Sequence, residues 1–409
     1  MKDLAAIKEK LTQFDQTQLL RFYDELDANE QEALLTQIDE IDFSVIQNSL
    51  NGSMTDKRGA ISPIPAMTID EIDANKDKYR KVGLEAIKAG KVGALLLAGG
   101  MGTRLGSDAP KGVYNVGINR DLYIFECLIN NLMDVVNEAG CYLHLFIMTS
   151  DKNDEATRSF LASKNYFGYN PEYVHFFKQE MAAATDFEGH AYLEAKNRVA
   201  TSPNGNGGWY VSLKNAGLAD FAGEQGIEWF NIFAVDNVLQ RIADPVFIGA
   251  TLENNKAAGA KVIRKNDRDE KVGAICYEDG HPSIVEYYEM TDDLLDQVDA
   301  NGDRVYNFGV ILNYLFRKDQ LDDVLSKNLP LHVVDKKIPY VNDAGEYIAP
   351  TEPNGHKYET LVLDMIKLMD DCLVFEVVRE KEFAPIKNKT GVDSVESARE
   401  LLKLNGVNL

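Results

Sequence analysis

The stretch GALLLAGGMGTRLGSDAPKGVYNVG, from Gly93 to Gly117, decides the fold of this chain. Its apolar beginning, ALLLA, has the length of a buried strand, and a glycine-rich turn follows at once. A strand that enters such a turn directs main-chain N–H groups toward a ligand above the carboxyl edge of a sheet. Arg104 lies inside the turn and Lys111 at its end. The stretch therefore predicts a phosphate-binding loop with two cations of its own.

Two common phosphate-binding motifs do not fit this loop. The dinucleotide fingerprint G-x-G-x-x-G is met by Gly100 and Gly102, but its third glycine position is Leu105, and Gly106 comes one place late. A Walker A loop needs G-K followed by Ser or Thr, and this sequence does not occur here. The spacing therefore disfavours an NAD-dependent dehydrogenase.

The composition limits the classes of partner. The chain of 409 residues is 45% hydrophobic and 26% charged, which is typical of a globular protein with two or three domains. It has 43 basic and 65 acidic residues, so its formal net charge is −22. Such a surface repels nucleic acid and anionic lipid, and neither is an expected partner. A phosphorylated ligand would be repelled as well, unless a local cluster of cations binds it.

Features of secreted or membrane proteins are not found in the sequence. The N-terminus lacks the apolar core of a signal peptide, and no apolar run reaches the length of a membrane span. The four cysteines are scattered and form no C-x-x-C or zinc-binding spacing. We therefore expect a cytoplasmic protein whose thiols stay reduced.

The pattern of apolar residues predicts an α/β protein. Residues 4–46 and 68–88 have helical spacing, and the linker at 51–67 is rich in Gly, Ser and Pro. From residue 92 onward, continuously apolar strands alternate with helices, which favours a doubly wound core. Two strands around a turn at 278–282 add an antiparallel part, so we expect a mixed sheet. The predicted division is an N-terminal helical segment (1–90), a central domain (91–325) and a small C-terminal domain (326–409).

The loop LAGGMGTRLGSDAPKG resembles the signature of the eukaryotic-type UDP-sugar pyrophosphorylases, most closely their UDP-N-acetylhexosamine branch. Further blocks similar to that branch follow in the same order across nearly the whole chain: FFKQEM, PNGNGGWY, VDNVLQRIADPVFIG, KVGAICYEDG, IVEYYE, YNFGVILNYLF, KKIPY, PNGHKYE and EFAPIKN. The resemblance implies a Rossmann-like nucleotidyltransferase core. It also implies a uridylyltransferase that joins UTP and a hexose 1-phosphate into UDP-N-acetylglucosamine and pyrophosphate, with Mg²⁺.

Nucleotidyl transfer of this kind needs no side-chain nucleophile. An oxygen of the sugar 1-phosphate attacks the α-phosphorus of UTP in line and pyrophosphate leaves, so the protein aligns the reactants and neutralises charge. None of the six histidines lies in an H-E-x-x-H motif, and no G-x-S-x-G motif occurs. We therefore expect the histidines to be structural.

The resemblance assigns the phosphate end of the site. Arg104, Lys111 and Lys387 are the implied catalytic cations. Asp236, in FAVDN at the end of a predicted strand, is the implied magnesium ligand, which suits an ion that takes one or two carboxylates and fills its other positions with phosphate oxygens and water. The implied contacts to the UTP phosphates are Gly99, Gly100, Gly102 and Thr103.

The resemblance also assigns the uracil and sugar contacts. Gln179 is expected on the uracil edge, where an amide offers both a donor and an acceptor. Lys357 is expected to assist Lys387 at the phosphates. Glu286 would accept hydrogen bonds from sugar hydroxyls, and Asn307 would contact the N-acetyl group. The remaining implied contacts are Gly205 and Asn206 around the base and sugar, and Gly273 around the hexose.

Two departures from the family pattern bear on substrate choice. The family block F-N-x-G-N stands here as YNFGV, so Val310 replaces its second Asn, and Q-G-M has become Q-E-M at 179–181. Three alternatives stay open: a pyrophosphorylase for glucose or galactose 1-phosphate, one with broad sugar use, and a non-catalytic UDP-sugar sensor. A sensor would have no need to keep Arg104, Lys111 and Asp236 together.

Overall fold

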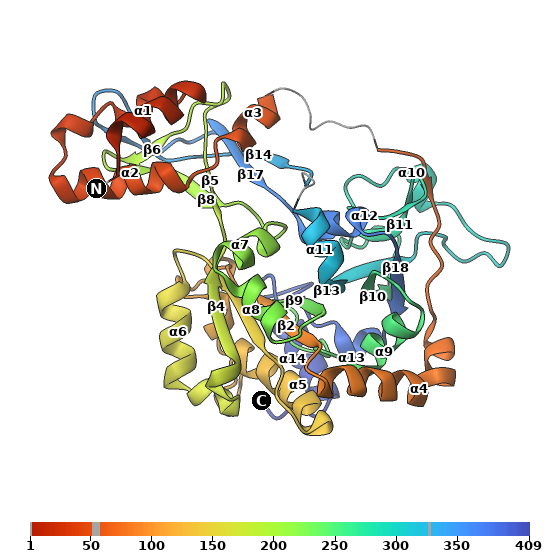
Figure 1. The fold of residues 1–409 in the computed structure, drawn as a ribbon. Coiled ribbons are helices and arrows are strands. Elements are labelled where there is room, and N and C mark those ends of the chain that lie inside the picture. Colours follow the sequence, from red (N-terminus) through yellow and green to blue (C-terminus); the bar gives the residue numbers. More distant parts are fainter. Residues whose placement is uncertain (1, 51–57, 326–328) are drawn as a thin grey trace. The chain divides into compact units, whose positions relative to one another are not determined.

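The computed structural model describes residues 2–50, 58–325 and 329–409 (Figure 1). They fall into two compact units, each assembled from three separate stretches of the chain. Among the described residues, unit 1 contains those within Met1–Lys57, Gln179–Gly208 and Leu329–Val362. Unit 2 contains those within Arg58–Lys178, Trp209–Asn328 and Leu363–Leu409.

Unit 2 is built on a 10-stranded sheet. Its parallel part has the order β9-β2-β3-β4, formed by Trp229–Ala234, Val92–Leu97, Leu145–Thr149 and Val174–Lys178. The strands β9, β2 and β3 are buried along their whole length, as their continuously apolar sequences predicted. Because parallel strands end at the same edge of a sheet, the loops after β2 and β9 are neighbours.

The strand β13 (Phe308–Arg317) makes the sheet mixed, as expected from the sequence. It pairs antiparallel with β9, with β10 (Ala258–Arg264) and with β11 (Ala274–Glu278). The strand β12 (His281–Val285) forms a hairpin with β11 around the predicted turn. The sheet is completed by β18 (Cys372–Glu376), parallel to β10, and β1 (Ile61–Ser62), antiparallel to β11.

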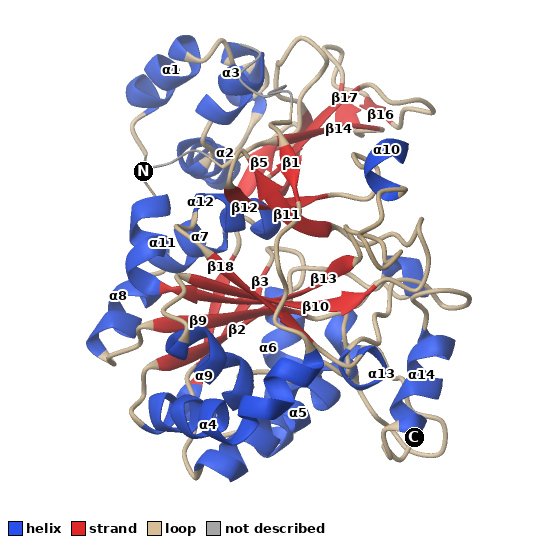
Figure 2. Ribbon diagram, turned by 90° about the vertical axis from the view of Figure 1, so that its right-hand side faces the viewer, coloured by secondary structure: helices blue, strands red, loops and turns tan. Residues whose placement is uncertain are grey.

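Helices cover both faces of this sheet (Figure 2). One face carries α4 (Ile69–Lys88), α5 (Ile124–Ala139) and α9 (Pro245–Glu253), and the other carries α7 (Trp209–Asn215), α8 (Leu218–Glu224) and α11 (Lys318–Val324). The other helices of the unit are α6 (Asp154–Ser163), α10 (Asp292–Leu295), α12 (Met365–Leu368), α13 (Arg379–Glu382) and α14 (Val395–Leu404). This is the doubly wound α/β core that the sequence predicted.

Local sequence explains the ends and the packing of two of these helices. A capping box at Thr68 begins α4, and α5 ends at Gly140, whose φ of 72° favours glycine. An added Cβ at Gly83 of α4 would lie 1.9 Å from the carbonyl oxygen of Pro245, at the start of α9. The two helices therefore touch through main chain, which only glycine permits.

Unit 1 packs the N-terminal helices onto short strands. Its helices α1 (Leu4–Gln13), α2 (Ala28–Glu40) and α3 (Ser44–Leu50) share one hydrophobic core with Leu193, Val199 and Tyr358. The strand pairs are β5 (Met181–Ala183) with β8 (Thr201–Pro203), β6 (Leu193–Ala195) with β7 (Arg198–Val199), β14 (His332–Lys336) with β17 (Gly355–Glu359), and β15 (Tyr340–Val341) with β16 (Tyr347–Ile348).

The compact units divide the chain at other positions than the predicted boundaries. The helix α4, predicted within the segment 1–90, packs on α9 in unit 2. The predicted C-terminal domain, 326–409, is shared between both units, with its later part in unit 2. The reason is that strands far apart in the sequence pair with each other, so that neither unit is one continuous stretch.

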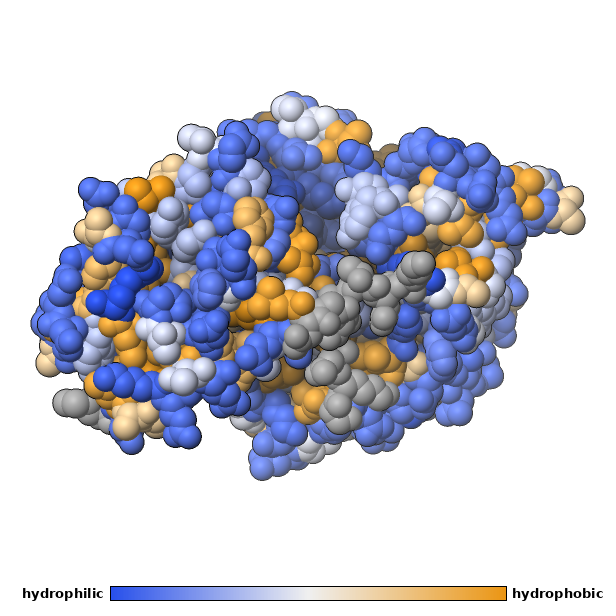
Figure 3. Space-filling view, turned by 90° about the horizontal axis from the view of Figure 1, so that it is seen from above, coloured by the Kyte–Doolittle hydropathy of each residue, from blue (hydrophilic) through white to orange (hydrophobic). Residues whose placement is uncertain are grey.

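The surface agrees with the composition. Hydrophilic side chains predominate on the face shown in Figure 3, and the hydrophobic ones form small, scattered patches. Within the described part of the chain, no helix is both long enough and apolar enough to cross a membrane.

Candidate active site

The predicted phosphate loop directly follows β2. Gly100 has open space where a Cβ would be, and Gly106 has a φ of 72°. The N–H of Lys111 donates to the carbonyl of Gly100 at 3.1 Å and so closes the loop. Within the residues that the structure describes, the N–H groups of Gly100 and Met101 meet no acceptor, which leaves them for an anionic ligand. This loop carries all four predicted phosphate contacts, Gly99, Gly100, Gly102 and Thr103.

Two side chains that the sequence analysis did not identify hold this loop. Ser150 Oγ donates to the carbonyl of Gly99 at 3.0 Å, and Asn153 Nδ2 donates to that of Ala98 at 2.9 Å. Both side chains are buried and follow β3, the neighbour of β2. The only signal in the sequence was the polar run TSDKND directly after an apolar strand.

Lys111 and Asp236 meet beyond the carboxyl ends of β2 and β9. The Lys111 Nζ lies 3.7 Å from Asp236 Oδ2, and the two side chains are 15% and 30% exposed. Burial lowers the pKa of the Lys111 ammonium, an effect that Asp236 opposes. The positive charges of Lys387 and Arg104 lower the same pKa further. Arg104 and Lys387 therefore both lie near enough to Lys111 to act on its charge, and this grouping of cations suits a phosphate ligand.

Lys387 reaches this place on the segment after β18. The N–H of Ile386 donates to the carbonyl of Asp236 at 2.8 Å, so the segment runs beside the loop that carries Asp236. The Lys387 Nζ is paired with Asp393 Oδ2 at 2.9 Å. Lys387, within the predicted C-terminal domain 326–409, belongs to unit 2 together with Lys111.

Lys389 is a further cation that the sequence analysis did not single out. Its Nζ lies 2.9 Å from the position that a Cβ would take at Gly106, so it lies against the phosphate loop. It has no ion pair or hydrogen bond with any residue in the described part of the chain. In the sequence, Lys389 could have been noticed only because it lies two residues after Lys387.

Two of the three predicted hexose contacts lie together in unit 2. A Cβ added to Gly273 would lie 3.7 Å from Glu286 Cδ and 3.6 Å from Val310 Cγ2. The N–H of Val310 also donates to the carbonyl of Gly273 at 2.9 Å. Val310, the residue that departs from the family pattern, is therefore part of this group. Asn307 directly precedes β13, and its carbonyl accepts from the N–H of Lys265 at 2.9 Å.

Two polar side-chain atoms at the end of the β10–β13 pair are buried without a hydrogen-bond partner among the described residues. Asn307 Oδ1 and Lys265 Nζ have no hydrogen-bond partner among the described residues. Burial is also the main cause of a lowered pKa at Lys265. A buried polar group without a hydrogen bond costs about 1–3 kcal/mol. A ligand that forms hydrogen bonds with these two atoms would remove this cost. Lys265 was not identified from the sequence.

The predicted uracil contacts belong to unit 1. Gln179 is buried and directly follows β4 in the chain. Gly205 has a φ of 88°, and an added Cβ would lie 2.1 Å from the carbonyl oxygen of Thr360, so only glycine fits. Asn206 Oδ1 accepts from the N–H of Val362 at 2.9 Å. Lys357 lies on β17 of the same unit.

The carboxylate of Asp236 is not part of a complete metal-binding cluster. Across residues 2–50, 58–325 and 329–409, no group of three or more His, Cys, Asp or Glu side chains could hold a metal ion by itself. Magnesium in nucleotide-dependent enzymes takes one or two carboxylates and completes its shell with phosphate oxygens and water. A partly exposed Asp236 beside the phosphate loop fits an ion that binds together with the nucleotide.

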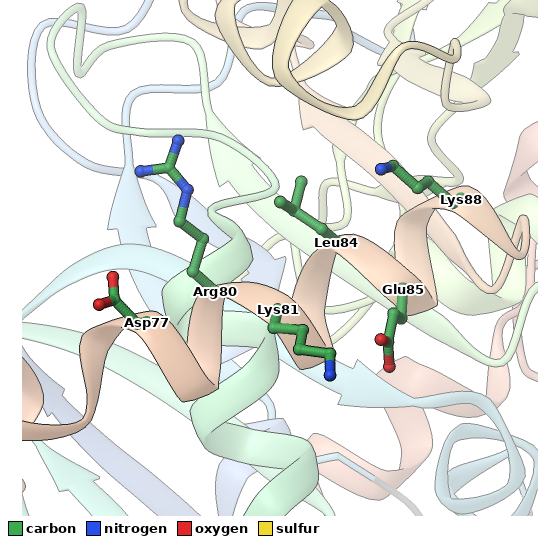
Figure 4. A pocket seen from close by; sticks show the side chains of 6 residues that line it. All are labelled: Asp77, Arg80, Lys81, Leu84, Glu85 and Lys88. Atoms are coloured by element: carbon green, nitrogen blue, oxygen red, sulfur yellow. The ribbon is translucent and has the colours of Figure 1, made fainter.

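A hollow of about 300 Å³ lies apart from these residues, on α4 (Figure 4). Arg80 on its rim forms an ion pair with Glu138 at 2.7 Å. Its lining mixes acidic and basic side chains and includes no predicted site residue, so it gives no reason to place the reaction there. The lining side chains all come from this one helix: Asp77, Arg80, Lys81, Leu84, Glu85 and Lys88.

Comparison with known proteins points to one family. Residues 45–405 match the family described as UTP–glucose-1-phosphate uridylyltransferase. The chain is 34% identical to UDP-N-acetylhexosamine pyrophosphorylase-like protein 1 of Mus musculus, over 95% of this chain and 81% of that protein. It is 35% identical to the UDP-N-acetylglucosamine pyrophosphorylase of Saccharomyces cerevisiae, over 96% of this chain and 88% of that protein.

A solved structure agrees with the sequence comparison. The uridine diphosphate N-acetylglucosamine pyrophosphorylase from Trypanosoma brucei, in complex with inhibitor, superposes with a TM-score of 0.83 at 27% identity. The superposition covers 98% of this chain and 84% of that one. The mixed sheet with helices on both faces is thus the nucleotidyltransferase fold expected from the sequence. The chain belongs to the UTP–glucose-1-phosphate uridylyltransferase family.

Proposed function

We propose that this family member transfers the uridylyl group of UTP to N-acetylglucosamine 1-phosphate, giving UDP-N-acetylglucosamine and pyrophosphate. The observation that carries the proposal is the cluster of cations around Asp236 beside the glycine loop. In a protein with a net charge of −22, such a cluster is suited to bind phosphates and neutralise them. The relatives named for UDP-N-acetylhexosamine and UDP-N-acetylglucosamine support the same reaction.

The cations serve the leaving group in this proposal. An oxygen of the sugar 1-phosphate forms a bond to the α-phosphorus of UTP, and the bond from that phosphorus to the α,β-bridging oxygen breaks. The electron pair leaves with pyrophosphate, where negative charge builds up. The free N–H groups of Gly100 and Met101 bind its oxygens, and Arg104 and Lys111 counter its charge. Lys387 approaches from the segment beside Asp236.

Asp236 would hold Mg²⁺ together with oxygens of the bound phosphates. The ion supplies further neutralisation of phosphate charge. Lys111, 3.7 Å away, pairs with the carboxylate and limits its orientations before the nucleotide binds. A cytoplasmic location remains our expectation from the cysteine pattern.

The groups near β13 support an N-acetylated sugar. Asn307 Oδ1 is a buried acceptor without a partner, and the acetamido N–H of the sugar is a donor that could meet it. Val310 packs beside Gly273 and Glu286, so it belongs to the same group. Glu286 would accept from the sugar hydroxyls.

Glucose 1-phosphate is the second candidate substrate. Val310 favours it, because the family block places a second Asn where this chain has an apolar side chain. The description of the family as a UTP–glucose-1-phosphate uridylyltransferase points the same way.

Exchange of labelled pyrophosphate into UTP tests the proposed reaction. The purified chain is incubated with Mg²⁺, pyrophosphate and either UDP-N-acetylglucosamine or UDP-glucose. We expect exchange that requires the UDP-sugar and is faster with the N-acetylated one. Binding of the UDP-sugar without exchange would identify a sensor and would contradict the proposal.

A further inference from the structure

The segment Glu382–Lys387, which we call the strap, is attached to the loop that carries Asp236. Its attachment is main chain against main chain: Asn237 and Pro385 form an antiparallel bridge, and Ile386 N–H donates to the carbonyl of Asp236 at 2.8 Å. The strap ends in Lys387, whose charge lowers the pKa of Lys111. Any shift of the strap along this loop therefore moves a cation relative to Asp236.

One side chain fixes the register of this attachment. Asn237 Nδ2 donates to the carbonyl of Glu382 at 2.7 Å, and Asn237 Oδ1 accepts from the N–H of Ala384 at 2.9 Å. The amide nitrogen and the amide oxygen of Asn237 thus both form hydrogen bonds with the strap, at residues two positions apart. Asn237 is 3% exposed, so water does not compete for these bonds.

The start of the strap is anchored a second time, in the core. Lys261 of β10 is fully buried, and its Nζ lies 2.6 Å from Glu382 Oε2. The same Nζ pairs with Asp244 Oδ2 at 3.0 Å. A buried ion pair of this kind adds little to stability, because desolvation offsets its attraction, but it fixes geometry. Glu382 is therefore a fixed point from which Asn237 sets the path of the next residues.

We propose that Asn237 is a positioning residue for the reaction: by holding the strap at Glu382 and Ala384, it sets the place of Lys387 at the phosphates. The proposal rests on the proposed function, because it assumes that Lys387 acts on bound phosphate. Asn237 itself touches no reacting atom. Loss of its side chain leaves Lys387 in the protein but frees the strap to shift, and a displacement of about 1 Å can lower a rate about 100-fold.

The test compares Asn237→Ala, Lys387→Ala and the double variant in pyrophosphate release from UTP and N-acetylglucosamine 1-phosphate. We expect each single variant to lower kcat about 10- to 100-fold, with the KM for UTP changed less than about threefold. Because both act through the same lysine, the double variant should be no slower than Lys387→Ala. Hydrogen exchange at Ala384 and Ile386 should be faster in Asn237→Ala than in the wild type.

The control variant is Gln37→Ala. Gln37 holds Val199 with the same chemistry, accepting from its N–H at 2.8 Å and donating to its carbonyl at 3.1 Å, but in unit 1. It should leave both kcat and exchange in the strap at wild-type values. If Asn237→Ala does not fold, Asn237→Asp serves instead: it keeps an acceptor for Ala384, loses the donor to Glu382 and adds a negative charge, so hydrogen exchange in the strap is its readout.

The outcomes separate this inference from the proposed function. A slow Lys387→Ala beside an Asn237→Ala of normal kcat would overturn the positioning role, as would additive losses in the double variant. A normal kcat in Lys387→Ala would overturn it as well, because nothing would remain for Asn237 to position. Absence of pyrophosphate release from the wild type with any hexose 1-phosphate would instead show that the proposed function is wrong.

Discussion

The pKa of Lys111 responds to the other charged side chains of the candidate site. Its ammonium is largely buried beside one carboxylate, and two further cations lower its pKa. Arg104, in contrast, lies exposed on the phosphate loop. The two cations of the glycine loop therefore differ in their burial.

Replacing Lys111 by Arg should change the alkaline side of the pH profile. Because the pKa of Lys111 is lowered, its positive charge is lost at a pH below the ordinary lysine value of about 10.4. The kcat/KM for UTP of the wild type should fall as the pH rises through that lowered value. In Lys111→Arg the fall should move to higher pH, since arginine stays protonated. Identical alkaline limbs in both proteins would contradict the role given to Lys111.

Arg104→Ala should act mainly on kcat. If its contact with the phosphates tightens as charge moves onto pyrophosphate, its removal lowers kcat about 100-fold and changes the KM for UTP little. Steady-state kinetics at saturating Mg²⁺ measure both constants. A variant with normal kcat and raised KM would show that Arg104 serves ground-state binding only.

The site residues that could be predicted from the sequence are those with a local pattern. Arg104 and Lys111 stand inside one glycine-rich motif, and the charge of Arg104 acts on Lys111 in the structure. Their role at the phosphates stays a prediction. Asn153, Asn237 and Lys389 were missed, because each acts through a contact with a segment far away in the chain. Such contacts leave no periodicity and no motif behind.

At the scale of elements, the β11–β12 hairpin beside the predicted sugar contacts is held by one buried carboxylate. Burial would raise the pKa of Glu278, but hydrogen bonds outweigh it and bring the pKa down to about 2. The donors are the N–H of Gly59 at 2.9 Å and Ser283 Oγ at 2.8 Å. Lys367 and Arg58 add ion pairs at 3.1 and 3.0 Å.

Glu278→Gln should therefore destabilise the protein in a pH-dependent way. A carboxylate with a lowered pKa stabilises the fold above the unfolded pKa and loses this effect as the pH falls through the folded one. We expect a loss on the order of 3 kcal/mol in the free energy of unfolding at pH 7. The difference from the wild type should shrink as the pH falls below about 4.5. Urea unfolding across this range measures it, and a constant difference would contradict the assignment.

Long periodic elements could be predicted from the sequence, and short ones could not. The helices α4 and α5 and the strands β2 and β3 lie where apolar spacing placed them. The paired strands of unit 1 have two to five residues each. Such strands depend on partners as far away in the chain as Glu359 is from His332, rather than on their own pattern.

At the scale of the whole molecule, a strongly acidic protein places Arg104, Lys111 and Lys387 close together, and we propose that these cations bind phosphate. The net charge of −22 repels UTP from most of the surface, and the glycine loop with its lysines and Arg104 is the local exception. One carboxylate, Asp236, lies among these cations, and we propose that it takes up Mg²⁺ with the nucleotide.

Removal of the metal or of Asp236 should therefore have the same effect. Chelation with EDTA should abolish pyrophosphate release, and added Mg²⁺ should restore it. Asp236→Ala should be slower by about 100-fold or more and should not be rescued by Mg²⁺, while its thermal unfolding midpoint stays near that of the wild type. Asp151→Ala is the matched control, a carboxylate that follows β3 and pairs with Lys178 at 2.9 Å. Normal rates in Asp236→Ala would place the metal elsewhere.

The central claim, an N-acetylhexosamine uridylyltransferase, is tested most directly by the choice of sugar. The measurement is pyrophosphate release from UTP with N-acetylglucosamine, N-acetylgalactosamine and glucose 1-phosphates, compared as kcat/KM in one assay. We predict that both N-acetylated sugars are preferred over glucose 1-phosphate by about tenfold or more, with N-acetylglucosamine 1-phosphate best. A kcat/KM that favours glucose 1-phosphate would contradict this account and would assign Val310 to a glucose pocket.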